Sequence, residues 1–179
     1  MGNESLIGCA VGVCFDKPGV ENTESVFRVV TDYIEETLKY TLVVSSTTGY
    51  TAKIAEKYLK DNEELIICKQ DISEKFSMRS DILNELEEKY TVVDIPKKYL
   101  NGKIGATGTN LLRKISQGVK VCFELIEYLI ENEILTENTR IIVIAGTLHG
   151  ADTAVAFRMK GKENYLVERI ICLPQNKIT

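Results

Sequence analysis

The sequence has little that would suit a membrane, a nucleic acid or a structural metal. No run of about 18 apolar residues is present, so we expect no membrane-spanning segment. Lys and Arg total 22 against 26 Asp and Glu, and the formal net charge is −4. Because nucleic acids are held mainly by Lys and Arg, this balance argues against a nucleic-acid partner, although it does not exclude a local basic patch. The single histidine, His149, argues against a structural zinc site, and we expect no metal.

The cysteines fit no disulfide framework. They are odd in number, contain no CxxC pair, and lie mostly in or beside apolar runs: Cys9, Cys14, Cys68, Cys122 and Cys172. We therefore expect reduced, mostly buried thiols, with Cys122 as a core residue rather than a reactive nucleophile. The first residues also lack the basic start and the apolar stretch of a signal peptide. Reduced thiols without such a signal predict a cytoplasmic protein.

Common nucleotide-binding and catalytic motifs are absent as well. No GxGxxG follows an apolar run, and neither GxxxxGK[ST] nor GxSxG occurs. These absences exclude the usual dinucleotide fingerprint, the P-loop and the nucleophile elbow of α/β-hydrolases. The shortage of catalytic candidates favours a binding module over an enzyme.

Apolar runs of strand length alternate with segments of helical spacing. The predicted strands are 6–15, 41–44, 65–68, 91–95, 140–145 and 167–173, and the predicted helices are 21–38, 51–59, 81–89, 111–115, 119–130 and 151–159. Residues 69–80 and 96–109 are predicted to be loops. This alternation predicts one α/β domain over residues 1–179, with three layers, in which helices flank a mostly parallel sheet. The pattern leaves the direction of the final strand open.

The loop with the most polar groups follows the predicted strand at 41–44. Hydroxyl side chains and one glycine lie at the start of the next predicted helix: Ser45, Ser46, Thr47, Thr48, Gly49 and Thr51. Ligands of open parallel sheets bind outside the carboxyl ends of the strands. The free N–H groups and the positive end of a helix attract anions there. The loop therefore predicts a phosphate site, and the alternative is that its hydroxyls only cap the helix.

A second loop follows the strongly apolar strand at 140–145. It contains Gly146, Thr147, His149 and Gly150, and the two glycines would let the backbone approach a ligand closely. His149 is the one side chain that titrates near neutral pH, and is either a ligand contact or an exposed loop residue. Asp152, or the threonine after it, is predicted to cap the helix expected at 151–159.

A third loop, at 16–23, adds a cation and a further polar side chain. Lys17 stands where a ligand phosphate could arrive, and its alternative role is that of a solvated lysine. Asn22 is a helix-cap candidate that could also contact a ligand. The three loops together give the candidate binding residues of the chain.

These segments, taken in order, resemble a family of small archaeal and bacterial proteins that are similar to the C-terminal domain of pyruvate kinase but stand alone. The resemblance is carried by FDKPGVENTE (15–24), VSSTTGYTA (44–52), QGVKVCFE (117–124), IIVIAGT (141–147) and GADTA (150–154). It implies the sheet arrangement of that domain, with the last strand antiparallel. The catalytic barrel of pyruvate kinase is absent, so the resemblance does not imply kinase activity.

The resemblance also implies a ligand. In allosteric pyruvate kinases the domain holds a sugar-bisphosphate effector, with one phosphate in a Ser/Thr-Gly-x-Ser loop after a strand. That loop is similar to Ser46, Thr47, Thr48, Gly49 and Thr51 here. Tyr50 stands where pyruvate kinases often have a basic residue, which weakens the case for a second phosphate on the same ligand.

We therefore expect a binding or regulatory module for a phosphorylated small molecule, either a mononucleotide such as FMN or a sugar phosphate. The single phosphate would lie in the hydroxyl-rich loop, and a ring would lie across the neighbouring strand ends. A flavin-dependent enzyme that uses the same site is one alternative, and a structural domain with no ligand is the other. A homodimer is expected, because two-fold dimers are the commonest soluble oligomers.

Overall fold

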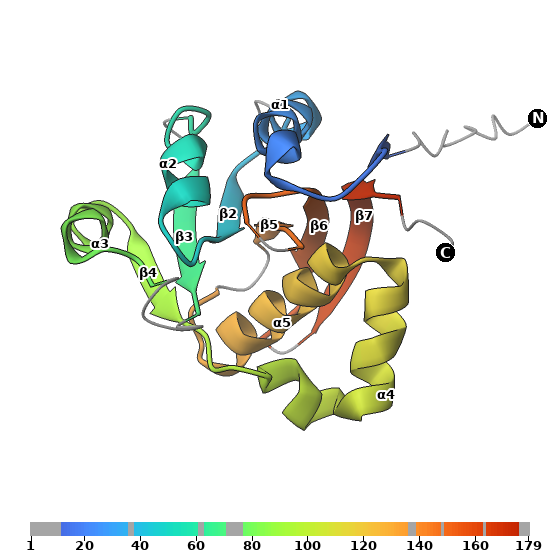
Figure 1. Ribbon diagram of the computed structural model, residues 1–179. Helices are drawn as coiled ribbons and strands as arrows, with labels where there is room; N and C mark the ends of the chain where they lie inside the picture. The colour runs from blue at the N-terminus through green and yellow to red at the C-terminus, as the bar shows by residue number, and fades with distance from the viewer. Residues whose placement is uncertain are drawn as a thin grey trace, which may run out of the picture.

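The computed structural model describes residues 12–35, 38–60, 63–70, 77–135, 139–147, 149–162 and 164–175. Within them the chain forms one seven-stranded sheet flanked by helices (Figure 1). The strands are β1 (Val13–Phe15), β2 (Tyr40–Ser45), β3 (Glu64–Lys69), β4 (Thr91–Asp94), β5 (Arg140–Ala145), β6 (Thr153–Met159) and β7 (Tyr165–Pro174). The helices are η1 (Val20–Asn22), a 3-10 turn, and α1 (Thr23–Tyr33), α2 (Tyr50–Ala55), α3 (Ser80–Glu87), α4 (Tyr99–Ile115) and α5 (Gln117–Glu131). The predicted α/β class is confirmed.

The sheet is parallel except for one strand. Its order is β1-β7-β6-β5-β2-β3-β4, and the pairs β1–β7, β5–β2, β2–β3 and β3–β4 are parallel. β6 runs antiparallel to both of its neighbours, β5 and β7. The last strand, β7, was expected to be antiparallel, and it is antiparallel only to β6. β7 runs parallel to β1 and in the common direction of the other strands, so the reversed strand is β6.

Two segments have a different secondary structure from the one predicted. Residues 151–159, expected as a helix, contain β6, which is buried almost throughout between β5 and β7. A short apolar run that is covered on both faces has no alternation, so its period does not distinguish a strand from a buried helix. Residues 96–109, expected as a loop, lie mostly in α4, which is interrupted at Gly105 (φ 69°, ψ 174°) and packs along α5. This packing offsets the weak helix propensity of its glycines.

The other elements agree with their predictions apart from their ends. β5 has the predicted bounds, whereas the helix expected at 21–38 consists of η1 and a shorter α1 that ends at Tyr33. The break between α4 and α5 lies at Ser116, whose Oγ accepts a hydrogen bond of 2.9 Å from the N–H of Val119. Gly118, in the gap between the predicted helices at 111–115 and 119–130, lies inside α5. The predicted strand at 6–15 is described only from residue 12, and β1 forms its end.

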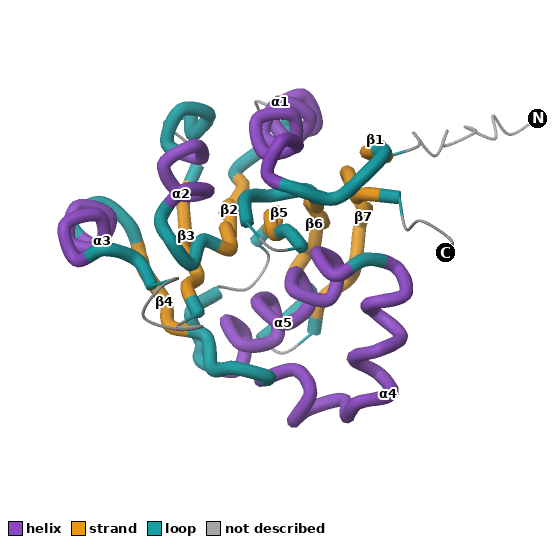
Figure 2. The backbone as a smooth tube through the Cα atoms, viewed as in Figure 1, coloured by secondary structure: helices purple, strands orange, loops and turns teal. Residues whose placement is uncertain are grey.

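The two faces of the sheet pack against different helices. Leu42 and Val44 of β2 belong to one buried cluster with Phe27 of α1, whereas Val43 between them belongs to a second cluster with Leu125 of α5. Figures 1 and 2 show α1 and α2 on one side of the sheet and α5 on the other. Strands covered on both faces have continuous apolar sequences, which explains the predicted pattern. Among the described residues, no helix combines the length and the apolar content needed to cross a membrane.

Candidate functional site

The strand order creates a topological switch point between β2 and β5. These two strands are parallel neighbours, with Val44 opposite Ile144. The chain after β2 continues to β3 and β4 on one side, and the chain after β5 continues to β6 and β7 on the other. Open α/β sheets bind ligands at the carboxyl ends of the strands at such a point. Two of the predicted segments lie here, the hydroxyl loop (residues 46–51) and the β5–β6 loop (residues 146–152).

Ser46 holds the hydroxyl loop in place. Its backbone N–H donates to the carbonyl of Cys68 (2.8 Å), and its buried Oγ accepts a hydrogen bond from the N–H of Ala52 (3.0 Å). The second bond satisfies a donor in the first turn of α2, which is the capping role. Ser45, the last residue of β2, is half-buried, and Gly49 takes a left-handed conformation (φ 88°) that leads into α2. Capping therefore accounts for Ser46, but not for the residues that follow it.

The other hydrogen-bond donors of the hydroxyl loop are not bonded to protein acceptors among the described residues. Within the described part of the chain, the backbone N–H groups of residues 47–51 have no hydrogen-bond acceptor. The hydroxyls of Thr47 and Thr48, both half-buried, likewise have no hydrogen-bond partner among those residues, and Thr51 is buried. Successive backbone N–H groups without acceptors make an anion-binding concavity. This loop can therefore hold an anion through neutral donors.

The β5–β6 loop is built around a buried carboxylate. Asp152 is 1% exposed, and its Oδ2 accepts hydrogen bonds from the N–H (3.1 Å) and the Oγ1 (2.8 Å) of Thr147. Its Oδ1 accepts a hydrogen bond from the Oγ1 of Thr153 (2.8 Å). The prediction that Asp152 caps a helix is wrong, because the segment after it is the strand β6. Asp152 instead organises the loop from within, and Thr147 is bound to it rather than available to a ligand.

The start of α5 lies against the same carboxylate. A Cβ atom on Gly118 would lie 2.1 Å from the Oγ1 of Thr153 and 3.0 Å from the Oδ1 of Asp152. Only glycine therefore lets α5 approach the loop this closely. The amino end of α5 therefore lies beside the Asp152 side chain. This contact was not predicted, although the glycine in QGVKVCFE is the signal that could have indicated it.

The two glycines of the β5–β6 loop allow close contacts with other protein atoms. A Cβ atom on Gly146 would lie 2.4 Å from the carbonyl oxygen of Gly150. Gly150 has a φ of 76°, and a Cβ atom there would lie 2.4 Å from the Oγ1 of Thr23. The same Oγ1 accepts a hydrogen bond from the N–H of Ala151 (3.0 Å), which ties the loop to the start of α1. The close approach predicted for these glycines is therefore an approach to protein atoms.

An aromatic pair connects the two loops. The rings of Tyr50 and His149 are stacked, with their centroids 4.8 Å apart and their planes at 29°. Tyr50 is the first residue of α2, and both side chains are exposed. Spacing in the sequence gave no sign that Tyr50 would meet His149. The stack places a flat aromatic surface beside the hydroxyl loop.

The third loop, residues 16–23, adjoins the β5–β6 loop, but its polar side chains interact with groups of the same loop. The ammonium of Lys17 lies 3.1 Å from the carboxylate of Glu21, and both side chains are largely exposed. A backbone hydrogen bond at Glu21, followed by the contact with Lys17, lowers the pKa of the Glu21 carboxyl. The side-chain amide of Asn22 donates to the carbonyl of Lys17 (2.8 Å). A Cβ atom on Gly150 would lie 2.9 Å from the Cα of Val20, so η1 adjoins the second loop.

The thiols offer no reactive group to this site. Cys68, Cys122 and Cys172 are buried and free, Cys14 is exposed and free, and Cys9 lies outside the described residues. Burial raises the pKa of the Cys122 thiol well above its usual value. It also raises the pKa of the Cys172 thiol to about 12. The prediction of mostly buried thiols is confirmed for the cysteines that are described.

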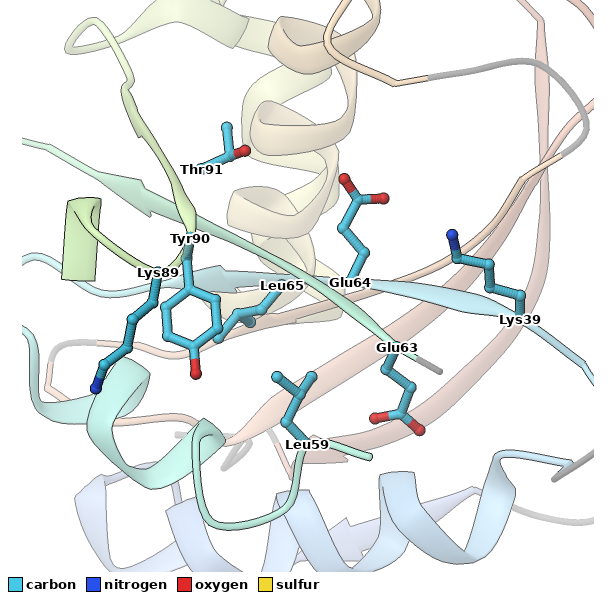
Figure 3. A pocket seen from close by; sticks show the side chains of 8 residues that line it. All are labelled: Lys39, Leu59, Glu63, Glu64, Leu65, Lys89, Tyr90 and Thr91. Atoms are coloured by element: carbon cyan, nitrogen blue, oxygen red, sulfur yellow. The ribbon is translucent and has the colours of Figure 1, made fainter. Parts of the chain in front are cut away.

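A cavity of about 620 Å³ lies at the opposite edge of the sheet, near the amino ends of β3 and β4 (Figure 3). Side chains of both charge signs line it, among them Lys39, Glu64 and Lys89. Lys89 forms ion pairs with Glu56 and Glu85. None of the predicted binding residues lines this cavity, so we do not assign the ligand to it.

No protein-family model matches the chain. Over the residues that the structure describes, no group of three or more His, Cys, Asp or Glu side chains is arranged to hold a metal ion. The interpretation of the site therefore depends on the donors and the aromatic surface that the two loops present.

Proposed function

We propose that the chain binds a phosphorylated small molecule at the carboxyl ends of β2 and β5, as a binding or regulatory module. The observation that carries the proposal is the run of backbone N–H groups over residues 47–51 that have no acceptor among the described residues. The hydroxyls of Thr47 and Thr48 add donors to the same turn. A phosphate accepts several such hydrogen bonds at once and needs no lysine for them.

The nearby charges suit one phosphate rather than two. Residues 46–51 include no Lys or Arg, and Lys53 in the next turn is paired with Glu56 and Glu85. The carboxylate of Asp152 is buried and bound by three hydrogen bonds, so its repulsion of an incoming phosphate is weakened. A monoester phosphate is therefore the group that these donors fit best.

The stacked rings of Tyr50 and His149 favour a ligand that has a ring. Flat heteroaromatic rings stack on exposed aromatic side chains, and this contact is tolerant of the ring's identity. A mononucleotide such as FMN would place its phosphate in the hydroxyl loop and its ring near this pair. A sugar phosphate would use the same donors without the stacking contact.

The finer assignment of the fold belongs to the same proposal. We propose that the sheet has the arrangement of the pyruvate kinase C-terminal domain, with the reversed β6 next to the parallel strands β5, β2, β3 and β4. A cytoplasmic location and a homodimer are part of it as well. The buried free thiols are compatible with a reducing compartment, and two-fold dimers are the commonest soluble oligomers.

An absorbance spectrum of the protein after incubation with FMN and gel filtration tests the proposal. We expect the flavin bands to be retained, and Thr48→Val to weaken FMN binding about tenfold, because a hydrogen bond to a charged group contributes about 1.5–3 kcal/mol. Thr91→Val is the matched control, since this exposed threonine lies at the opposite edge of the sheet. Loss of the bands from the wild-type protein, together with no binding of sugar phosphates, would favour the structural domain.

The flavin-dependent enzyme is distinguished by a second assay on the same sample. A protein that retains FMN but does not oxidise a reduced nicotinamide acts as a binding module. Turnover of the nicotinamide by the loaded protein would instead favour the enzyme.

A further inference from the structure

A second cavity, of about 490 Å³, lies where β3 and β4 end and α4 packs on α5. Its lining includes the basic side chains of Lys97, Lys98, Arg113 and Lys120 and the carboxylate of Glu124. Figure 1 shows the two helices side by side below the sheet. The volume is within the range of about 300–1,000 Å³ that small-molecule sites occupy. This basic cavity contains none of the residues proposed for the hydroxyl loop.

The carboxylate of Glu124, the one carboxylate among the described lining residues, is paired with a cation. Glu124 is 1% exposed, and its Oε2 accepts a hydrogen bond from the Nζ of Lys120 at 2.5 Å. Its Oε1 accepts from the N–H of Leu100 (3.3 Å), and its Oε2 also lies 3.4 Å from the Nε2 of Gln70. Glu124 therefore ties the start of α4 and the end of β3 to α5. Among the described lining residues, the side chains of Lys98 and Arg113 add positive charge in a chain whose formal net charge is −4.

Lys120 is built into the wall of the cavity. Its side chain is 8% exposed, and Glu124 is its one hydrogen-bond partner among the described residues. An ammonium has three N–H donors, so the donors that Glu124 does not use are available to a group inside the cavity. A buried cation with unused donors is costly unless an anion or ordered water takes them.

Lys98 and Arg113 also line the basic cavity. Lys98 is the N-cap of α4 and has a φ of 60° and a ψ of 22°, a left-handed conformation that lysine rarely adopts. Strained residues of this kind are concentrated at binding sites. The Nε of Arg113 donates to Gln117 (3.2 Å), and its Nη1 donates to Asn110 (3.0 Å), both on the protein. These bonds orient the guanidinium and leave its other donors for a ligand.

We propose that the basic cavity binds a small molecule that carries a diphosphate group. A diphosphate has several negative charges and many acceptor oxygens, which match a buried ammonium, exposed lysines and an oriented guanidinium. The cavity has room for an organic group beyond the phosphates. The site lies on α4 and α5 and is separate from the hydroxyl loop, so the two sites can be tested independently.

Calorimetric titration of the full chain with inorganic pyrophosphate tests the proposal. We expect binding that weakens as salt is added, because salt screens charge pairs. Lys98→Asn and Arg113→Gln should each weaken binding about tenfold, the loss expected for a charge-assisted hydrogen bond. Asparagine tolerates the left-handed conformation, so Lys98→Asn removes the charge without straining the backbone. Lys98→Arg keeps the charge and should bind nearly as the wild type does.

Two controls separate this site from the rest of the molecule. Lys57→Gln removes an exposed cation that pairs with Glu24 on α1, and should leave pyrophosphate binding unchanged. Thr48→Val, in the hydroxyl loop, should also leave it unchanged. No binding of pyrophosphate, or unaltered binding by both Lys98→Asn and Arg113→Gln, would overturn the proposal. Equal binding of citrate would overturn the choice of a diphosphate, and loss of binding in Thr48→Val would move the anion to the hydroxyl loop.

Discussion

The two loops at the switch point differ in how they use their polar groups. In the β5–β6 loop and at the start of β6, the N–H and hydroxyl of Thr147, the N–H of Ala151 and the hydroxyl of Thr153 are bonded to protein acceptors. In the hydroxyl loop, Ser46 alone is used in this way, and the donors of residues 47–51 have no acceptor among the described residues. Both loops look polar in the sequence, but the hydroxyls of Thr147 and Thr153 are bonded to Asp152, whereas those of Thr47 and Thr48 have no partner among the described residues.

This difference indicates that the two loops have different roles at the carboxyl ends of β2 and β5. The β5–β6 loop is joined to α1 by the hydrogen bond to Thr23 and packs closely on α5 at Gly118. The hydroxyl loop is the surface that would meet a ligand. Substitutions in the first should therefore change stability, and substitutions in the second should change binding.

The largest effect is expected for Asp152→Ala. The substitution leaves the donors of Thr147 and Thr153 without their acceptor, and each buried unpaired donor costs about 1–3 kcal/mol. We expect the free energy of unfolding in urea to fall by about 2–4 kcal/mol. Asp81→Ala is the control, because this carboxylate is exposed and its removal should change stability much less than Asp152→Ala does. A loss as small as that of the control would contradict the supporting role of the loop.

A comparison of two helical glycines gives the next largest effect. The Cβ of Gly118→Ala would lie 2.1 Å from the Oγ1 of Thr153, and such overpacking costs about 1–3 kcal/mol. Gly102→Ala in α4 adds a Cβ with no atom within 4 Å and should stabilise the protein by up to about 1 kcal/mol. Thermal unfolding of both variants measures the difference. Equal shifts of the two melting temperatures would mean that α5 does not press on the β5–β6 loop.

Within the hydroxyl loop, Ser46 and Thr48 should respond in opposite ways. Ser46→Ala removes the cap on Ala52 and should cost about 1 kcal/mol of stability. Thr48→Val should change stability by less than about 0.5 kcal/mol, because its hydroxyl has no partner among the described residues. Chemical denaturation and FMN titration of both variants separate the two roles. If Thr48→Val loses stability while its affinity is unchanged, its hydroxyl is a cap.

The smallest effect at neutral pH concerns the thiols near the β5–β6 loop. Burial raises the pKa of the Cys172 thiol from about 9.0 to about 12, so the native state keeps a proton that the unfolded state loses. The free energy of unfolding should therefore be constant below pH 9 with respect to this group, and should fall as the pH rises from 9 to 12. Denaturation at several alkaline pH values, in wild type and Cys172→Ala, measures this contribution. An equal slope in both proteins would show that Cys172 does not contribute.

The sequence predicted the parallel part of the sheet better than the rest. β2, β3, β4 and β5 are continuous apolar runs between helical segments, and this pattern has few other interpretations. β6 was missed because ADTAVAF has neither alternation nor a strong strand composition. Its burial between β5 and β7 depends on contacts between distant parts of the sequence. α4 was missed because its glycines weaken the helical pattern, which packing on α5 overrides.

The two loops of the candidate site could be singled out from the sequence, but the contacts of their residues could not. Loop composition and position after an apolar strand indicated the hydroxyl loop and the β5–β6 loop. No local pattern could show that Asp152 would bind Thr147, or that Tyr50 would stack on His149, because these contacts depend on which strands become neighbours. The basic cavity was missed for the same reason, since its cations lie on separate elements.

The central claim is that the donors of the hydroxyl loop bind the phosphate of the ligand. The most direct measurement is a titration of the ¹⁵N-labelled protein with FMN, followed by the amide resonances. We predict that the amide signals of residues 47–51 shift first and furthest, and that Thr48→Val reduces the shifts at a given FMN concentration. Unchanged amide signals over these residues, with or without shifts elsewhere, would contradict the account.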